Sequence, residues 1–488
     1  MRTPSEVHSR RGFLRGTAAL YAAGSNVEAQ ERATQQATEQ AAAPGEVTRT
    51  LARYLVAAKP GDLPENVRRE GVRTLVNWVG CALGGSKEDA VSNSLAALTP
   101  IYPGGKTTIL GRREKLDPLH AALVNGISSH VLDFDDTHLK TVIHPAGPVA
   151  PALLALAEQQ KVTGLELLHA LVLGCEVECR IGNAVYPQHY DVGWHITGSV
   201  GPFGAAAATG KLLGLDEQKM LWALGLAASQ PVGLREMFGS MTKSFHPGRA
   251  AQNGLTAALL ASHGFTSSEQ AIEAKRGWAN VLSTSRKYGE ITGQLGQRFE
   301  TLLNTYKPFA CGIVTHPTID GCLTLRAAYK LKPEQMESVE LTVHPLVPEL
   351  TGKTAPTVGL EGKFSIYYLA AVALITGAAG QSQFTDKLVH DPGVIGLRDK
   401  VHLIVDKAMK EDQTRVSIRL TDGRVVTQMV EHAVGSVEKP MTDAALDAKF
   451  LDLATVALSP VRARKVLALC RQVETLPDAA AIARAAAA

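Results

Sequence analysis

The spacing of apolar residues is helical from about residue 46 to residue 292. Pro64 opens one such segment, in which small and apolar residues recur on one helix side at Val67, Gly71, Leu75, Trp78 and Val79. Capping patterns at Thr163 to Glu166 and Thr266 to Glu269 precede further apolar runs, and Asp216 is placed as a helix N-cap. These patterns predict a large all-helical domain.

The pattern changes to strict alternation in the last third of the chain. Three alternating runs are predicted to be strands: Val339 to Val343, Val416 to Leu420 and Val425 to Met429. The turn dipeptide Asp422-Gly423 joins the last two as a hairpin. We expect a smaller α/β domain, here called the lid domain, over residues 293–440. Residues 441–488 return to helical spacing and are expected to rejoin the helical domain, so the predicted fold class is mainly α.

The N-terminus resembles an export signal. Ser9-Arg10-Arg11-Gly12-Phe13-Leu14-Arg15 is followed by a short apolar segment and by Val27-Glu28-Ala29. This order predicts a twin-arginine signal over residues 1–29, cleaved after Ala29, and hence a periplasmic protein. A disordered basic tail is the alternative, and the protein would then stay in the cytoplasm. Residues 30–45 contain no large apolar side chain and are expected to be a disordered linker.

Composition narrows the function classes. The formal charge is only +3, from 50 Lys and Arg against 47 Asp and Glu, which gives no indication of a nucleic-acid partner. No run of 18 apolar residues occurs, so no stable membrane insertion is expected once the signal is removed. The six cysteines lack zinc-ligand spacing. Cys175 and Cys179 lie on one face of an apolar helix and are interpreted as core residues.

The densest polar cluster is Asp133-Phe134-Asp135-Asp136-Thr137-His138, followed by His144-Pro145. Three carboxylates this close repel one another unless cations compensate. The cluster is compatible with a catalytic site of tuned carboxyl groups, with a divalent-metal site, or with a solvated helix cap. Residue types alone do not choose among these three.

Three further clusters contain groups that suit an anionic substrate. Gly193-Trp194-His195 places a histidine before a helix, where an anion would be favoured. Met241 to Arg249 contains Lys243, His246 and Arg249, and Lys307-Pro308 lies where the helical domain passes into the lid domain. Taken alone, a histidine placed like His195 is usually structural, and the run from Met241 to Arg249 is equally compatible with a solvated basic loop.

Together, the order and the residues of the four clusters resemble the motifs of the MmgE/PrpD family. This family includes 2-methylcitrate dehydratase, cis-aconitate decarboxylase and iminodisuccinate epimerase. The resemblance covers about residues 46–470. It rests on Asp133 to His138, His144-Pro145, Gly193-Trp194-His195 with the Ala-rich run to Asp216, Thr242-Lys243 to Gly248, and Lys307-Pro308.

The resemblance implies a large helical domain, a smaller α/β lid domain, a homodimer, and an active site between the domains that uses no metal, iron-sulfur cluster or other cofactor. By matching position, it implies that the catalytic residues are Asp133, His144, His195, Lys243 and Lys307. Residues of the same motifs are predicted to contact the substrate: His246, Asp136 and Thr242.

The sequence departs from the family pattern after Lys307. The dehydratase and the decarboxylase place a histidine shortly after this lysine, whereas this chain has Cys311-Gly312, and His316 comes later. The departure leaves the family resemblance intact and puts both of those named activities in question.

The predicted function is a metal-independent lyase on a small di- or tricarboxylate. Dehydration, decarboxylation and epimerisation of such acids all develop negative charge on a carbon beside a carboxylate, which requires fixed cations and a proton-transfer group. A hydro-lyase similar to 2-methylcitrate dehydratase is favoured, with His144 or His195 moving the proton. The alternatives are an epimerase or decarboxylase of the same family, and a non-catalytic periplasmic protein that binds carboxylates.

Overall fold

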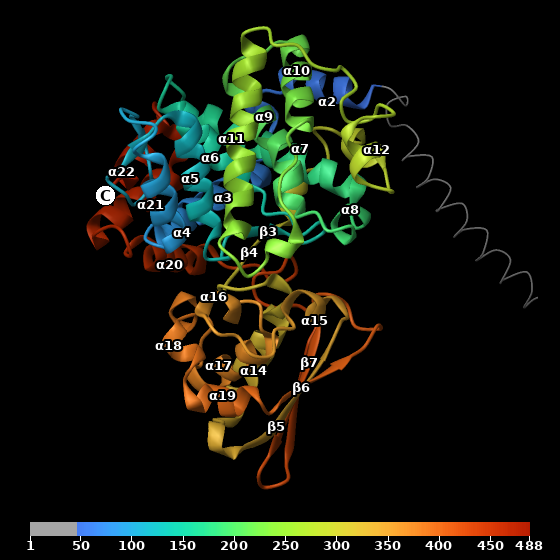
Figure 1. Cartoon of the computed structure of the whole chain (residues 1–488), viewed down its shortest axis with the longest axis vertical. Coiled ribbons are helices and arrows are strands. Elements are labelled where there is room, and N and C mark those ends of the chain that lie inside the picture. The colour runs from blue at the N-terminus through green and yellow to red at the C-terminus, as the bar shows by residue number, and fades with distance from the viewer. Residues whose placement is uncertain (1–45) are drawn as a thin grey trace, which may run out of the picture.

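The computed structural model describes residues 46–488, which form a large helical domain and a smaller α/β domain joined end to end (Figure 1). The predicted export signal and linker lie outside the described residues. The expectation of a mainly α fold with a smaller α/β domain is confirmed.

The helical domain is built around long helices that pack on one another. Its helices are α2 (Val47–Ala57), α3 (Glu65–Gly85), α4 (Asp89–Leu98), α5 (Pro118–His130), α6 (Ala146–Ala157), α7 (Gly164–Val185), α8 (Gln188–Asp191), α9 (Ile196–Leu212), α10 (Glu217–Ala228), α11 (Thr242–Ser262), α12 (Trp278–Leu282) and α13 (Tyr288–Thr292). Two short strand pairs join them: β1 (Thr107–Thr108) with β2 (Lys115–Leu116), and β3 (Asp136–His138) with β4 (Asn304–Tyr306). Helix α11 packs against both α5 and α9, and α9 packs against α7.

The helix-start signals were mostly right. Pro64 precedes α3, whose predicted apolar side is buried, Thr163 and Glu166 form a capping box on α7, and Asp216 caps α10. The expected capping box at Thr266 to Glu269 is wrong, because the following residues form turns. Glu269 instead pairs with Arg49 across the surface.

The lid domain consists of a four-stranded sheet with helices on one face (Figure 1). Its elements are α14 (His316–Tyr329), β5 (Met336–Val343), α15 (Leu346–Thr351), α16 (Gly359–Gly362), α17 (Ile366–Thr376), α18 (Asp386–Val389), α19 (Pro392–Arg398), β6 (Val401–Val405), β7 (Thr414–Leu420) and β8 (Val425–Val430). The strand order is β6-β5-β7-β8, and only β5 and β6 run parallel. The predicted hairpin is β7–β8, and Gly423 in its turn has a φ of 89°, a backbone conformation that favours glycine.

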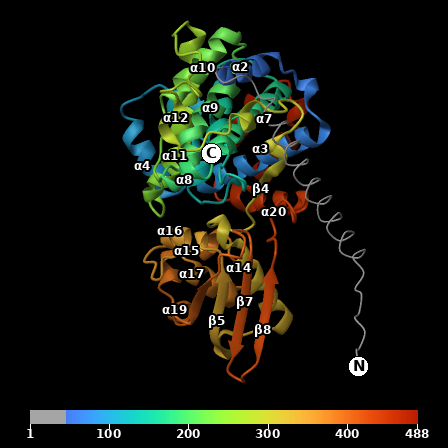
Figure 2. The same ribbon diagram turned by 90° about the vertical axis from the view of Figure 1, so that its right-hand side faces the viewer.

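The chain crosses between the domains more than once. Strand β4 pairs with β3, so the crossing into the lid domain follows Tyr306 and lies nearer residue 308 than the expected 293. The last helices, α20 (Asp443–Ala454), α21 (Pro460–Arg471) and α22 (Ala480–Ala486), share a core with α3, α6 and α7. Figure 2 shows α20 near β4 at the junction of the two domains.

None of the helices in the described part of the chain combines the length and the apolar character that a membrane crossing requires. The six cysteines are all buried and free, and Cys175 and Cys179 lie in the core as expected.

Candidate active site

A small cavity of about 50 Å³ lies between the two domains. Its walls on the helical side are Asp133, Thr137, Val142, His144, Tyr190, His195, Phe238, Lys243 and Lys307, and those on the lid side are Gly312, Ile313, Val314, Leu350, Thr351 and Phe364. All five residues predicted to be catalytic therefore meet at one cavity. Sequence reasoning missed Thr137, Tyr190, Phe238 and the lid-side wall.

Asp133 holds two lysines at the cavity wall. Its Oδ1 accepts hydrogen bonds from Lys243 Nζ at 2.7 Å and from Lys307 Nζ at 2.9 Å, and all three side chains are buried. Burial alone would raise the pKa of Asp133, but the two ammonium groups outweigh burial and hold it well below its usual value. Asp133 has a φ of 51°, a strained conformation that is common at functional sites.

Two features of the fold bring these residues together. The pairing of β3 with β4 sets Asp136 opposite Tyr306, so Lys307 lies beside the segment that contains Asp133. Helices α5 and α11 approach closely where Gly126 faces Gly248, since a Cβ on Gly126 would lie 2.4 Å from the Gly248 Cα. That contact places the start of α11, with Lys243, beside the end of α5.

His144 carries an unprotonated nitrogen. Its Nδ1 lies 2.7 Å from the backbone oxygen of Asp136, and a carbonyl oxygen only accepts, so Nδ1 carries the hydrogen. Burial, together with the nearby His130, lowers the pKa of His144 to about 3 even though Asp135 opposes the shift. The ring is therefore neutral near pH 7, and Nε2 has a free electron pair.

His195 precedes α9 and pairs with a second histidine. Its Nδ1 lies 2.8 Å from the Nδ1 of His246, so one ring donates and the other accepts. Burial, followed by the proximity of His246, lowers the pKa of His195 well below its usual value, and burial lowers that of His246 to about 4. His246 contacts His195 and is absent from the cavity lining, so its contact with a substrate stays a prediction.

The other two predicted substrate contacts also lie outside the cavity. Asp136 Oδ2 accepts hydrogen bonds from Ala146 N–H and from the Asn304 side chain, and burial, then the Asp135 charge, raises its pKa to about 7. Thr242 is exposed at the first position of α11 and does not line the cavity. Because adjacent helix positions differ by about 100°, the turn that directs Lys243 inward directs Thr242 outward.

Behind the cavity, Asp135 connects two histidines. His130 Nδ1 donates to Asp135 Oδ2 at 2.8 Å, and Asp135 Oδ1 lies 3.5 Å from His144 Nδ1. His130 is the last residue of α5 and was not singled out from the sequence, because it ends an apolar helix. Its position three residues before Asp133 was the available signal.

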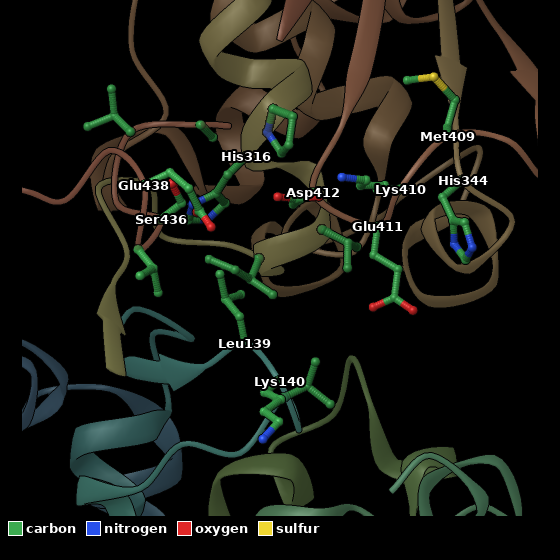
Figure 3. A pocket seen from close by; sticks show the side chains of 17 residues that line it. Leu139, Lys140, His316, His344, Met409, Lys410, Glu411, Asp412, Ser436 and Glu438 are labelled. Carbon is green, nitrogen blue, oxygen red and sulfur yellow. The ribbon is translucent and has the colours of Figure 1, made fainter. Parts of the chain in front are cut away.

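The lid-side wall shows where the residues that follow Lys307 lie, in the segment where the sequence departs from the family pattern. Gly312 lines the cavity, whereas His316 lines an adjoining, larger groove of about 570 Å³ that shares Ile313 and Val314 with it. Figure 3 shows this groove, with Lys140 on its helical side and Glu411 and Glu438 on its lid side. His316 is buried but does not line the cavity itself.

Three of the histidines could together hold a cation. One ring nitrogen from each of His130, His144 and His195, here called the three-histidine cluster, lies within 4.8 Å of the others. The Nδ1 atoms of these rings contact Asp135, the Asp136 carbonyl and His246, and three imidazoles with such second contacts are a set that would suit zinc. The expectation of a metal-free site therefore stays a prediction.

Both domains of the chain match models of known protein families. A family model described as the MmgE/PrpD N-terminal domain matches residues 49–291, and one described as the MmgE/PrpD C-terminal domain matches residues 309–475.

Curated relatives match most of the chain. The chain is similar to cis-aconitate decarboxylase of Aspergillus terreus, with 28% identity over 477 residues that cover 91% of this chain and 96% of the relative. The enzyme of that name from Homo sapiens is 28% identical over 88% of this chain and 92% of its own length. The 2-methylcitrate dehydratase of Cupriavidus necator is 23% identical over 74% of this chain and 80% of its own length. With both domain models matched over most of its length, the chain belongs to the MmgE/PrpD family.

Proposed function

We propose that this protein is a lyase that acts on a small polycarboxylate by moving a proton at a carbon beside a carboxylate. One observation carries the proposal: neutral His144, whose Nε2 is unprotonated, lines the same cavity as Lys243 and Lys307. The histidine supplies a base, and the two lysines supply a cationic site for the negative charge that proton removal creates.

The lysines keep donors for a substrate. Each ammonium has three N–H groups. Lys243 gives one to Asp133 Oδ1, and Lys307 gives two, to the Oδ1 and the backbone oxygen of the same residue. The remaining N–H groups can hold a substrate carboxylate and stabilise it as it becomes an enolate-like dianion. Asp133, Lys243 and Lys307 are all buried, which strengthens these interactions.

A second histidine supports dehydration as the favoured reaction. In a hydro-lyase, the C–H and C–O bonds break, a C=C bond forms, and the proton taken from carbon ends on the departing hydroxyl group as water. His144 suits the first proton transfer, and His195, on the same cavity with His246 behind it, suits the second. Asp133 acts by holding the lysines.

A decarboxylase is the second candidate, and the comparisons favour it. Relatives named cis-aconitate decarboxylase match a larger share of this chain, at higher identity, than those named 2-methylcitrate dehydratase. In that reaction the C–C bond to a carboxylate breaks, CO₂ leaves, and the carbanion takes a proton from one of the same histidines. An epimerase would return the proton to the opposite face.

Product analysis separates these candidates. Purified protein is incubated with citrate, 2-methylcitrate, cis-aconitate, malate and amino-dicarboxylates, and the products are identified by NMR and CO₂ release. An alkene with water indicates a hydro-lyase, CO₂ a decarboxylase, and inversion alone an epimerase. Binding with no conversion of any acid would indicate a non-catalytic carboxylate-binding protein and overturn the proposal.

Three further features belong to the proposal. The twin-arginine motif at Arg10-Arg11 supports export to the periplasm, and the family resemblance supports a homodimer. The absence of a metal requirement is proposed because proton transfer and charge stabilisation are each assigned to protein side chains.

A further inference from the structure

Three consecutive backbone oxygens around Asp133 each accept a hydrogen bond from a different buried lysine. The donors and acceptors are Lys363 Nζ with Leu132 O, Lys307 Nζ with Asp133 O, and Lys449 Nζ with Phe134 O. At the centre of this loop the backbone of Asp133 has a φ of 51°, a conformation that persists only where surrounding contacts hold it. The proposed mechanism uses Lys307, and the other two lysines have no assigned role.

Lys449 joins the residue after Asp133 to the backbone of Lys307. It lies on α20, and its Nζ donates to the backbone oxygens of Phe134 at 2.6 Å and Lys307 at 2.8 Å, and to the side-chain oxygen of Asn77. The Asp133 carboxylate and the Lys307 ammonium meet at 2.9 Å. One ammonium group therefore holds the backbone on both sides of that contact.

Lys363 makes the corresponding link from the lid domain. Its Nζ donates to the backbone oxygens of Leu132 and Ala310 and to the side-chain oxygen of Gln381. Leu132 belongs to the helical domain, and Ala310 to the segment that enters the lid domain. Phe364, the next residue after Lys363, lines the cavity. Lys363 therefore connects the two domains at the edge of the cavity.

The contacts of Lys363 and Lys449 indicate a positioning role. Neither residue lines the cavity, and all three N–H groups of each ammonium are donated to protein oxygens. Burial lowers the pKa of each lysine to about 8, so both remain largely protonated at pH 7. Neutral acceptors compensate a buried cation less well than a carboxylate does, so two such lysines around one loop need an explanation.

We propose that Lys363 and Lys449, here called the lysine brace, position Asp133 and Lys307 for catalysis. The inference rests on the proposed function and deepens it, because it names the residues that fix the carboxylate and the substrate-holding cation relative to each other. The brace connects residues 132–134 with the segment that begins at Lys307, on both sides of the contact between the two side chains. Without the brace, Asp133 can relax to an ordinary backbone conformation and move away from Lys307.

One substitution and a matched control separate positioning from general stability. Lys449→Met removes the ammonium group and keeps an unbranched side chain. Lys211→Met is the control, because Lys211 Nζ also donates to three backbone oxygens, those of Leu55, Val56 and Ala58. None of these four control residues lines the cavity.

We expect Lys449→Met to lower kcat by about 10- to 100-fold, because a displacement of about 1 Å at a reacting centre can have an effect of that size. KM should change little, since the misplaced groups stabilise the dianion that forms in the transition state. Assays are run well below the Tm of every variant, where a loss of stability alone leaves the turnover of folded protein unchanged. A folded Lys449→Met variant with the kcat of the Lys211→Met control would overturn the brace. If Lys449→Met does not fold, Lys363→Met tests the same proposal from the lid side, with the same expected loss of kcat.

Crystal structures of the variants give a measurement that does not depend on turnover. If the wild type converts no acid in the panel, the lyase assignment fails by itself, and the brace is judged from structure. We expect Asp133 Oδ1 and Lys307 Nζ to separate from 2.9 Å to beyond about 3.5 Å in Lys449→Met and to stay in contact in Lys211→Met. An unchanged distance in Lys449→Met, with the φ of Asp133 still positive, would overturn the brace.

Discussion

Replacing Asp133 by asparagine tests the charge arrangement of the cavity. The substitution keeps the size of the side chain and removes the charge that two buried lysines share, at 2.7 Å from Lys243 and 2.9 Å from Lys307. Breaking a buried ion pair by removing one partner costs about 3–5 kcal/mol, because an uncompensated charge stays buried. We expect the free energy of unfolding to fall by about this amount at pH 7.

The loss should depend on pH in a defined direction. Burial lowers the pKa of Lys243, and Asp133 opposes that shift, so the variant should lower this pKa further. A lysine whose folded pKa is depressed binds more protons in the unfolded state, and stability then rises with pH through that window. The deficit of Asp133→Asn should therefore shrink between pH 7 and about pH 10, where the unfolded lysine also loses its proton.

Urea unfolding at several pH values is the assay, and Asp422→Asn is the control. Asp422 pairs with Arg424 on the exposed hairpin turn, and such surface pairs contribute little to stability because water and salt screen them. A loss for Asp133→Asn no larger than that of the control, or a deficit that is constant across pH, would refute the proposed charge arrangement.

Three other predictions concern the core, the metal and the export signal. Glu178 on α7 is fully buried with no partner for either carboxylate oxygen, and burial, then Asp136, raises its pKa well above the usual value. Its contribution to stability is complete below the unfolded pKa and is lost as pH rises, so Glu178→Gln should gain stability relative to the wild type from pH 5 to pH 8 in urea unfolding. Prolonged dialysis against a chelator should leave turnover unchanged, whereas stoichiometric zinc by elemental analysis and loss of activity would assign the three-histidine cluster to a metal. Replacing Arg10 and Arg11 by lysine should keep the full-length chain in the cytoplasm, as cell fractionation and the intact N-terminal mass would show; unchanged export would contradict the twin-arginine assignment.

Much of the fold could be predicted because its signals are local. The hairpin follows from alternation around Asp422-Gly423, and the starts of α7 and α10 follow from their capping residues. The expected helix after Thr266 failed because a capping pattern describes only the first turn. Here the following backbone closes turns instead, with Trp278 N–H donating to the Ala271 carbonyl.

The cavity could be predicted only in part. Motif resemblance identified five residues whose contacts are distant in sequence, such as Asp133 with Lys307. It did not indicate which side chains of a motif point into the cavity. Thr242 and Lys243 are neighbours in sequence and point to different sides of α11. His130 was missed because a histidine ending an apolar helix looks like a core residue until Asp135 and His144 are placed beside it.

Hydrogen exchange at carbon tests the central claim most directly. Wild type, His144→Ala and the buried control His189→Asn are incubated in D₂O with the panel of carboxylic acids, and deuterium beside a carboxylate is followed by proton NMR. His189 is a suitable control because its ring nitrogens contact the Leu282 carbonyl and Ser199, and it does not line the cavity. The proposed mechanism predicts incorporation by the wild type and the control, and its loss in His144→Ala. Equal incorporation by a folded His144→Ala variant, or no incorporation by the wild type with any acid, would contradict proton transfer by His144.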